Sequence, residues 1–134
     1  MILIESSVLM EAQRIPSSEN AIRLAELMAS GEAAVAGPVI MEYLRGARSE
    51  EEFEFLSNRI ASITFLDVDR QTWVLAGRLS RRYIRAGQAM SDLDVVIAAT
   101  AIRYGVPLYT LDSDFARIPE LNLYEPSSRE SAEQ

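Results

Sequence analysis

Short apolar runs alternate along the chain with longer segments of periodic hydrophobicity. The runs lie at 1–4, 33–36, 61–66 and 106–110, with a weaker one at 121–124. Continuous apolar runs of this length are typical of strands buried in a parallel sheet. Between them, apolar residues recur at helical spacing at 8–14, 17–30, 38–46, 49–60, 70–86 and 91–104. This alternation predicts an α/β fold with a central, mostly parallel sheet of roughly four to five strands flanked by helices.

Turn-forming residues separate these segments where the helices are expected to begin and end. Gly37-Pro38 precedes one helix, with the proline suited to its first turn, and Gly105 follows another. None of the stretches between segments is long enough to join two domains. We therefore expect a single domain over 1–126, followed by a Ser/Glu-rich tail at 127–134 that is disordered.

Acidic residues lie at the ends of several apolar segments. Glu5 ends the first expected strand, and Asp112 and Asp114 follow the fourth. Asp94 begins the most apolar helix, and Glu42 borders the apolar face of another. In open α/β sheets, ligands bind beyond the carboxyl ends of the strands. We expect the acids to meet there, although Asp94 reaches this edge only if the loop before it runs there.

Each acid also has a structural explanation when it is taken alone. Ser91 and Asp94 have the spacing of a capping box, and an acid in the first turn of a helix is stabilised by the helix dipole. Asp112 suits a turn, and Glu42 suits a helix surface. The conjunction of several acids on one sheet edge is what favours a divalent-metal site.

The residue types that are missing narrow the chemistry further. The sequence has no His, no Cys and no Lys, so it offers no imidazole base, no thiolate and no nitrogen or sulfur ligands for zinc. Carboxylate oxygens suit hard cations such as Mg²⁺ or Mn²⁺. A receiver domain, which also carries an acidic cluster on a parallel sheet, is disfavoured because it normally relies on a lysine.

Four motifs resemble those of the PIN-domain ribonucleases, in particular the VapC-type toxins of bacterial toxin–antitoxin pairs. They read ILIESSVL, VIMEYLRGA, DVVIAATA and TLDSDFARI, and the resemblance covers the chain from Met1 to about Tyr124. It implies a three-layer PIN-like fold and a cytoplasmic, Mg²⁺- or Mn²⁺-dependent endoribonuclease toxin that hydrolyses RNA. It also implies an antitoxin partner and a homodimer.

The resemblance assigns roles to individual positions. The catalytic acids would be Glu5, Glu42, Asp94 and Asp112. The metal would be held by Glu5, Asp94, Asp112 and Asp114. Ser7 matches the hydroxyl that the family has near its first acid. Asp92 is an additional acid that serves as a cap or as a supporting residue.

The first motif departs from the family, which normally has Asp where this chain has Glu5. The extra methylene lengthens the side chain by about 1.5 Å. A displacement of about 1 Å can lower a rate by about 100-fold. The departure is compatible with a tolerated variant and with an attenuated enzyme. The alternative function is therefore a catalytically weakened PIN-like module that binds antitoxin or RNA.

Charge adds one candidate binding surface. The formal net charge is −7, which argues against a generally basic coat for nucleic acid. Four arginines nevertheless share one face of the helix at 70–86; they are Arg78, Arg81, Arg82 and Arg85. This face suits either RNA phosphates or solvent. No apolar run approaches the roughly 20 residues of a membrane span, so no membrane association is expected.

Overall fold

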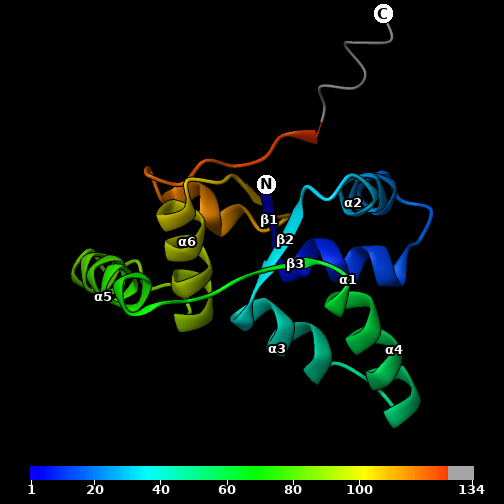
Figure 1. Ribbon diagram of the computed structural model, residues 1–134. Coiled ribbons are helices and arrows are strands. Elements are labelled where there is room, and N and C mark those ends of the chain that lie inside the picture. Colours follow the sequence, from blue (N-terminus) through cyan, green and yellow to red (C-terminus); the bar gives the residue numbers. More distant parts are fainter. Residues whose placement is uncertain (127–134) are drawn as a thin grey trace, which may run out of the picture.

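A four-stranded parallel sheet lies at the centre of the computed structural model, which describes residues 1–126 (Figure 1). The strands are β1 (Ile2–Ile4), β2 (Ala33–Ala36), β3 (Thr64–Leu66) and β4 (Leu108–Tyr109). Their order across the sheet is β3-β2-β1-β4, and all three pairings are parallel. The α/β fold with a parallel sheet is thus confirmed. The disordered tail predicted at 127–134 falls outside the described residues.

Within residues 1–126, six α-helices and one short 3₁₀ helix surround the sheet. They are α1 (Ser6–Arg14), α2 (Glu19–Ala29), α3 (Gly37–Arg45), α4 (Glu50–Ala61), α5 (Arg70–Arg85), α6 (Asp92–Tyr104) and η1 (Ser113–Arg117). In Figure 1, α5 and α6 lie on the left of the sheet, whereas α1, α2 and α4 lie on the right. The sheet therefore forms the middle of three layers, and β2 leads directly into α3.

Side-chain caps explain why most helices begin where the sequence predicts. Ser18, Ser49, Asp69 and Ser91 each accept a hydrogen bond from a backbone N–H in the first turn of the helix that follows. Gly105 ends α6 in the left-handed conformation, with a φ of 66°. These local signals lie within a few residues of one another, so they can be recognised in the sequence.

Two predicted starts and one predicted strand differ from the structure for physical reasons. Helix α1 starts at Ser6 because the side chain of Glu5 caps it. The third strand starts at Thr64, since α4 continues to Ala61. The fifth strand is reduced to a single parallel bridge between Leu108 and Leu123.

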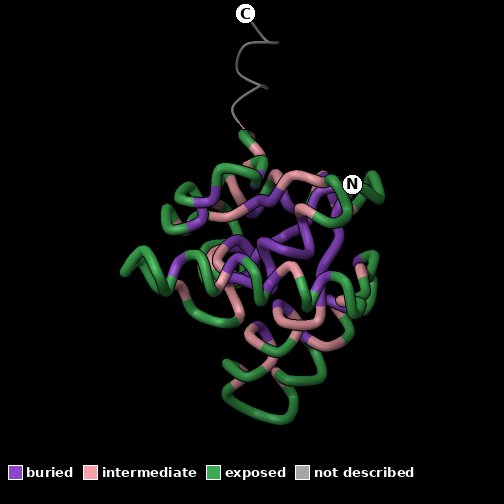
Figure 2. Tube along the Cα trace, turned by 90° about the vertical axis from the view of Figure 1, so that its left-hand side faces the viewer, coloured by how far each residue is buried: buried purple, intermediate pink, exposed green. Residues whose placement is uncertain are grey.

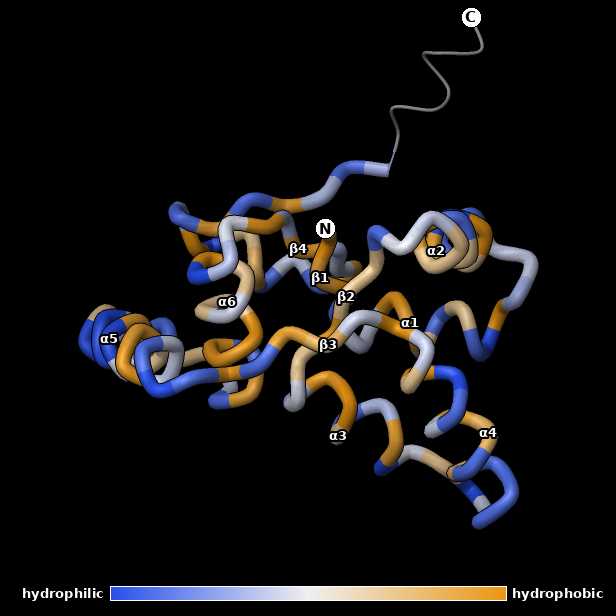
Figure 3. The backbone as a smooth tube through the Cα atoms, viewed as in Figure 1, coloured by the Kyte–Doolittle hydropathy of each residue, from blue (hydrophilic) through white to orange (hydrophobic). Residues whose placement is uncertain are grey.

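The core is dominated by the strands and by α6. Leu3 and Ile4 in β1 are fully buried, and all four residues of β2 are buried as well. Helix α6 is buried continuously from Val95 to Ala101 and packs against both α3 and α5. Figure 2 shows these buried segments in the interior of the molecule, and Figure 3 shows the strands and much of α6 as apolar. Within residues 1–126, no helix combines the length and apolar character that a membrane crossing needs.

Candidate active site

The acids predicted from the motifs follow the carboxyl ends of β1 and β4 or lie on the helices beside them. Glu5 directly follows β1, and Asp112 lies three residues beyond the end of β4. Parallel pairing of β1 with β4 places Ile4 opposite Tyr109, so the residues after both strands leave the sheet at the same edge. Helix α3 begins at the same edge, directly after β2. The sheet topology thus brings together segments that are remote in sequence.

The Glu5 carboxylate is buried and accepts four hydrogen bonds. Its Oε2 accepts from Ser6 Oγ at 2.7 Å and from the backbone N–H of Ser7 at 3.1 Å. Its Oε1 accepts from Ser7 Oγ and from Thr110 Oγ1, the latter at 2.6 Å. Only 5% of the residue is exposed. A buried carboxylate needs such donors because it has lost its hydration.

Glu42 on α3 is linked to Glu5 through a shared hydroxyl. Ser6 Oγ lies 3.2 Å from Glu42 Oε1 while it also donates to Glu5. Burial raises the pKa of Glu42, and the negative charges of Glu5 and Asp94 raise it further. The Ser6 hydrogen bond and Arg45, at 3.9 Å from Glu42 Oε2, act in the opposite direction.

Asp94 lies in the first turn of α6, immediately before the buried part of that helix. Ser91 Oγ accepts from its backbone N–H at 3.2 Å, so the capping interaction expected from the sequence is present. Burial raises the pKa of the Asp94 carboxyl, and the charges of Glu5, Asp112 and Asp114 raise it as well. Asp94 therefore donates to the cap made by Ser91 and also shares the electrostatic environment of the other acids.

Asp112 and Asp114 follow β4 and differ in how they are engaged. Asp112 caps η1 by accepting from the N–H of Asp114 at 2.9 Å, and its own N–H donates to Thr110 Oγ1 at 3.0 Å. Asp114 is exposed and forms an ion pair of 3.1 Å with Arg117. Asp92 also lies in the first turn of α6 and is exposed.

Two residues with hydroxyl groups belong to this hydrogen-bond network although the sequence pattern does not indicate them. Ser6 joins Glu5 to Glu42, and Thr110 joins Glu5 to the backbone of Asp112. Serine and threonine are common in turns, so neither position stands out in a single sequence. The only available signal is that both residues flank strand ends that carry an acid. Ser7, which was predicted, bonds to Glu5 and accepts from the N–H of Leu111 at 2.9 Å.

Excess negative charge makes this group of acids a chemically suitable environment for a hard cation. Within the described part of the chain, the only ion pairs made by the five acids are those of Glu42 with Arg45 and of Asp114 with Arg117. All of the donors are oxygen atoms, as Mg²⁺ and Mn²⁺ prefer. No three acidic side chains in residues 1–126 stand close enough to enclose an ion in their present positions. Binding therefore requires some of these side chains to turn toward one another.

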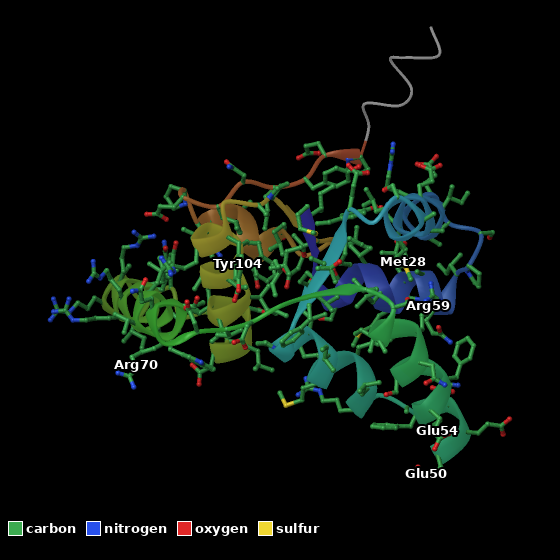
Figure 4. All side chains as sticks on the ribbon, viewed as in Figure 1. Met28, Glu50, Glu54, Arg59, Arg70 and Tyr104 are labelled. Carbon is green, nitrogen blue, oxygen red and sulfur yellow. The ribbon has the colours of Figure 1, made fainter. Side chains whose placement is uncertain are left out.

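The four predicted arginines are on α5, and they are not equivalent. Arg82 forms a two-pronged ion pair with Glu120, with N–O distances of 2.6 and 2.8 Å. Arg78, Arg81 and Arg85 are exposed and make no ion pair with any residue from 1 to 126. In Figure 4, nitrogen-bearing side chains project from the outer side of α5, away from α6.

Comparisons with known proteins agree with this architecture. The PIN domain model matches residues 2–121. Ribonuclease VapC11 of Mycobacterium tuberculosis is 33% identical, with 90% of this chain and 96% of the relative covered. Ribonuclease VapC19 of the same organism is 34% identical, with 75% and 82% covered.

A solved structure shows the same fold at lower identity. VapBC2 from Rickettsia felis, bound to a DNA fragment from its promoter, has a TM-score of 0.80 and 21% identity, with 92% of this chain and 98% of that chain covered. The parallel sheet, the order of the motifs and these relatives lead to one assignment. The chain belongs to the PIN-domain family, within its VapC group.

Proposed function

We propose that this protein is a metal-dependent endoribonuclease, the cytoplasmic toxin of a toxin–antitoxin pair. The observation that carries this proposal is the placement of Glu5, Glu42, Asp94 and Asp112 at one edge of the sheet, where burial and neighbouring carboxylates raise the pKa of Asp94 and Glu42. Structural acids are usually paired, whereas perturbed acids that share one environment are typical of functional sites. The relatives at 33% and 34% identity are ribonucleases, and the Rickettsia felis structure contains a VapBC pair, which supports an RNA substrate and an antitoxin partner. A homodimer is proposed from the family alone.

By the family resemblance, the acids that would hold the ion are Glu5, Asp94, Asp112 and Asp114. When bound, Mg²⁺ or Mn²⁺ would offset their repulsion, polarise the scissile phosphate and lower the pKa of a water molecule. Asp94 and Asp112 are the best placed of these acids to bind an ion, because they are only partly buried.

A carboxylate of the chain must accept the proton of the attacking water, because the sequence has neither histidine nor lysine. A raised pKa makes a carboxylate a stronger base and brings it closer to the operating pH. Glu42, which is not among the acids that would hold the ion, is therefore the side chain best suited to accept that proton. The Ser6 hydroxyl holds Glu42 Oε1 near Glu5. Within residues 1–126, the ion-pair partner of the other oxygen, Glu42 Oε2, is Arg45 at 3.9 Å.

Metal dependence is the first property to test. Purified protein would be incubated with a panel of structured RNAs in Mn²⁺, in Mg²⁺ and in excess chelator, and the products would be resolved by gel electrophoresis. We expect cleavage with either ion and none in chelator. Cleavage that persists in chelator would contradict the proposal.

The alternative function, a weakened module that binds antitoxin or RNA, is favoured by the engagement of Glu5, whose carboxylate already accepts four hydrogen bonds. The Glu5→Asp variant separates the two functions when it is assayed beside the wild type. Cleavage by both proteins supports the toxin, whereas cleavage by the variant alone shows that the natural chain is attenuated. RNA binding without cleavage by either protein would leave the binding module as the function.

A further inference from the structure

The geometry points to a role for Glu5 that the sequence does not predict: Glu5 is a positioning residue that organises the acidic edge, and the ion is held by the other acids. This inference rests on the proposed metal-dependent function. It differs from direct ligation, the role that the resemblance assigns to Glu5. Glu5 is suited to this role by the hydrogen bonds that saturate its carboxylate, by the contacts of its partners and by its burial.

Hydrogen bonds saturate the Glu5 carboxylate. A carboxylate offers about four lone-pair sites, and Glu5 accepts from Ser6 Oγ, Ser7 N, Ser7 Oγ and Thr110 Oγ1. An oxygen that binds a cation must turn a lone pair toward it. Glu5 would have to release at least one of these donors to do so, and the residue is only 5% exposed, so water offers little replacement.

The partners of Glu5 hold the other acids in place. Ser6 Oγ, which donates to Glu5, also lies 3.2 Å from Glu42 Oε1, so it brings α1 close to α3. Thr110 accepts from the N–H of Asp112 at 3.0 Å, and Ser7 accepts from the N–H of Leu111 at 2.9 Å. Glu5 thus fixes the backbone from which Asp112 projects. Removing it would loosen two of the segments that carry acids.

The length of the side chain suits this role. Glu5 caps α1 through the N–H of Ser7 and at the same time reaches Thr110 after the neighbouring strand β4. The Asp that the family normally has at this position lacks one carbon–carbon bond of this reach, about 1.5 Å. Asp94 and Asp112, by contrast, are only partly buried. They retain the access to solvent that an incoming hydrated ion needs.

The test compares Mn²⁺ affinity, measured by isothermal titration calorimetry, in wild type, Glu5→Gln and Asp94→Asn. Glutamine keeps the size of the side chain, and its amide can donate to the hydroxyls of Ser7 and Thr110, which are able to accept. We expect Asp94→Asn to weaken binding by more than about 100-fold and Glu5→Gln by about tenfold, in the range of residues that orient ligands. Equal losses in the two variants would overturn the inference and leave the proposed function intact. No binding by the wild type would overturn both.

A second pair of variants tests positioning through Thr110. Thr110→Val removes the hydroxyl at nearly constant volume, and Thr110→Ser restores it. We expect the valine variant to bind Mn²⁺ about tenfold more weakly and the serine variant to bind like the wild type. A valine variant that melts at a lower temperature but binds Mn²⁺ normally would show that the hydroxyl is merely structural, and would overturn the positioning role.

A crystal structure of the wild type grown with Mn²⁺ decides the question even if Glu5→Gln fails to fold. We expect oxygen atoms of Asp94 and Asp112 among the ligands, with both oxygens of Glu5 still bonded to Ser6, Ser7 and Thr110. A Glu5 oxygen within ligand distance of the ion, about 2.2 Å, would overturn the inference.

Discussion

Helices α5 and α6 pack against each other, yet they place their charged residues in opposite environments. In α6, every residue from Val95 to Ala101 is buried, and the acids are confined to the first turn. In α5, only one face is buried, through Thr72, Ala76, Leu79 and Tyr83, and the arginines lie on the exposed remainder. Helix α6 thus carries candidate metal-binding acids at its amino end, and α5 carries candidate RNA-binding arginines along its exposed side.

This difference shows that the role of a charged residue depends on how deeply its helix is buried and on which charges lie nearby. Asp94 precedes a buried helix and lies near other acids, so burial and repulsion raise its pKa. The exposed arginines are surrounded by water, which solvates charge at little cost. Glu50 and Glu54 contrast with Asp94, because these two glutamates lie on the part of α4 farthest from the sheet (Figure 4).

The largest effect that the comparison predicts is on stability, through two isoleucines. Ile97 in α6 is fully buried, whereas Ile84 in α5 is 65% exposed. We expect Ile97→Ala to lower the free energy of unfolding by about 3 kcal/mol, since it leaves a cavity in the core. The matched Ile84→Ala change should stay within about 0.5 kcal/mol. Urea denaturation followed by circular dichroism measures both, and similar losses would contradict the contrast between the helices.

The next effect concerns RNA binding by α5. We expect the triple variant Arg78→Gln, Arg81→Gln and Arg85→Gln to weaken binding and to lower the salt dependence of log K by about 2, at roughly 0.7 for each single-stranded phosphate contact. Fluorescence anisotropy over a range of salt concentrations measures the slope. An unchanged slope would show that this face is only solvated.

A smaller effect concerns stability against pH in the absence of metal. Because the pKa of Asp94 is raised in the folded state, the unfolded chain ionises first, and stability falls as the pH rises above the ordinary value of 3.8. The loss is complete once the pH exceeds the raised pKa of the folded state. Asp94→Asn should therefore be more stable than the wild type at pH 7 in chelator, with an advantage that shrinks toward pH 4. A less stable variant at pH 7 would mean that the negative charge is compensated.

The smallest expected effect comes from the ion pair between Arg82 and Glu120. Both side chains are almost half exposed, at 47% and 44%, so solvent screens their attraction. We expect a double-mutant cycle with Arg82→Met and Glu120→Gln to give a coupling energy of about 0.5 kcal/mol. A coupling above about 2 kcal/mol would show that α5 is anchored by charge as well as by its buried face.

The fold was predictable where local signals coincide. Proline and glycine at 37–38 and the cap at Ser91 fix the starts of α3 and α6 within a residue or two. The predicted start of β3 is too early because Ala61 still belongs to α4 and Ser62 caps that helix, so the strand begins at Thr64. Strand β4 is shorter than its apolar run because its length depends on pairing with β1, which is a non-local contact.

The sequence predicts which acids come near this sheet edge, but it does not predict their hydrogen bonds. Glu5 and Asp94 lie at the ends of apolar segments, and Glu42 borders the apolar face of its helix. The bond from Thr110 to Glu5 joins residues 105 positions apart and depends on the register of two strands. A single sequence does not reveal that register. The sequence therefore shows which acidic side chains the site can contain, whereas their hydrogen-bond partners can be seen only in the folded structure.

The central claim is that the acids at this sheet edge cut RNA, and the rate of cleavage by Asp94→Asn tests it most directly. Single-turnover rates in saturating Mn²⁺ would be compared for wild type, Asp94→Asn and Glu54→Gln, a matched loss of one charge on the outer part of α4. The account predicts a rate at least about 100-fold lower for Asp94→Asn and an unchanged rate for Glu54→Gln. Equal rates for wild type and Asp94→Asn would contradict it.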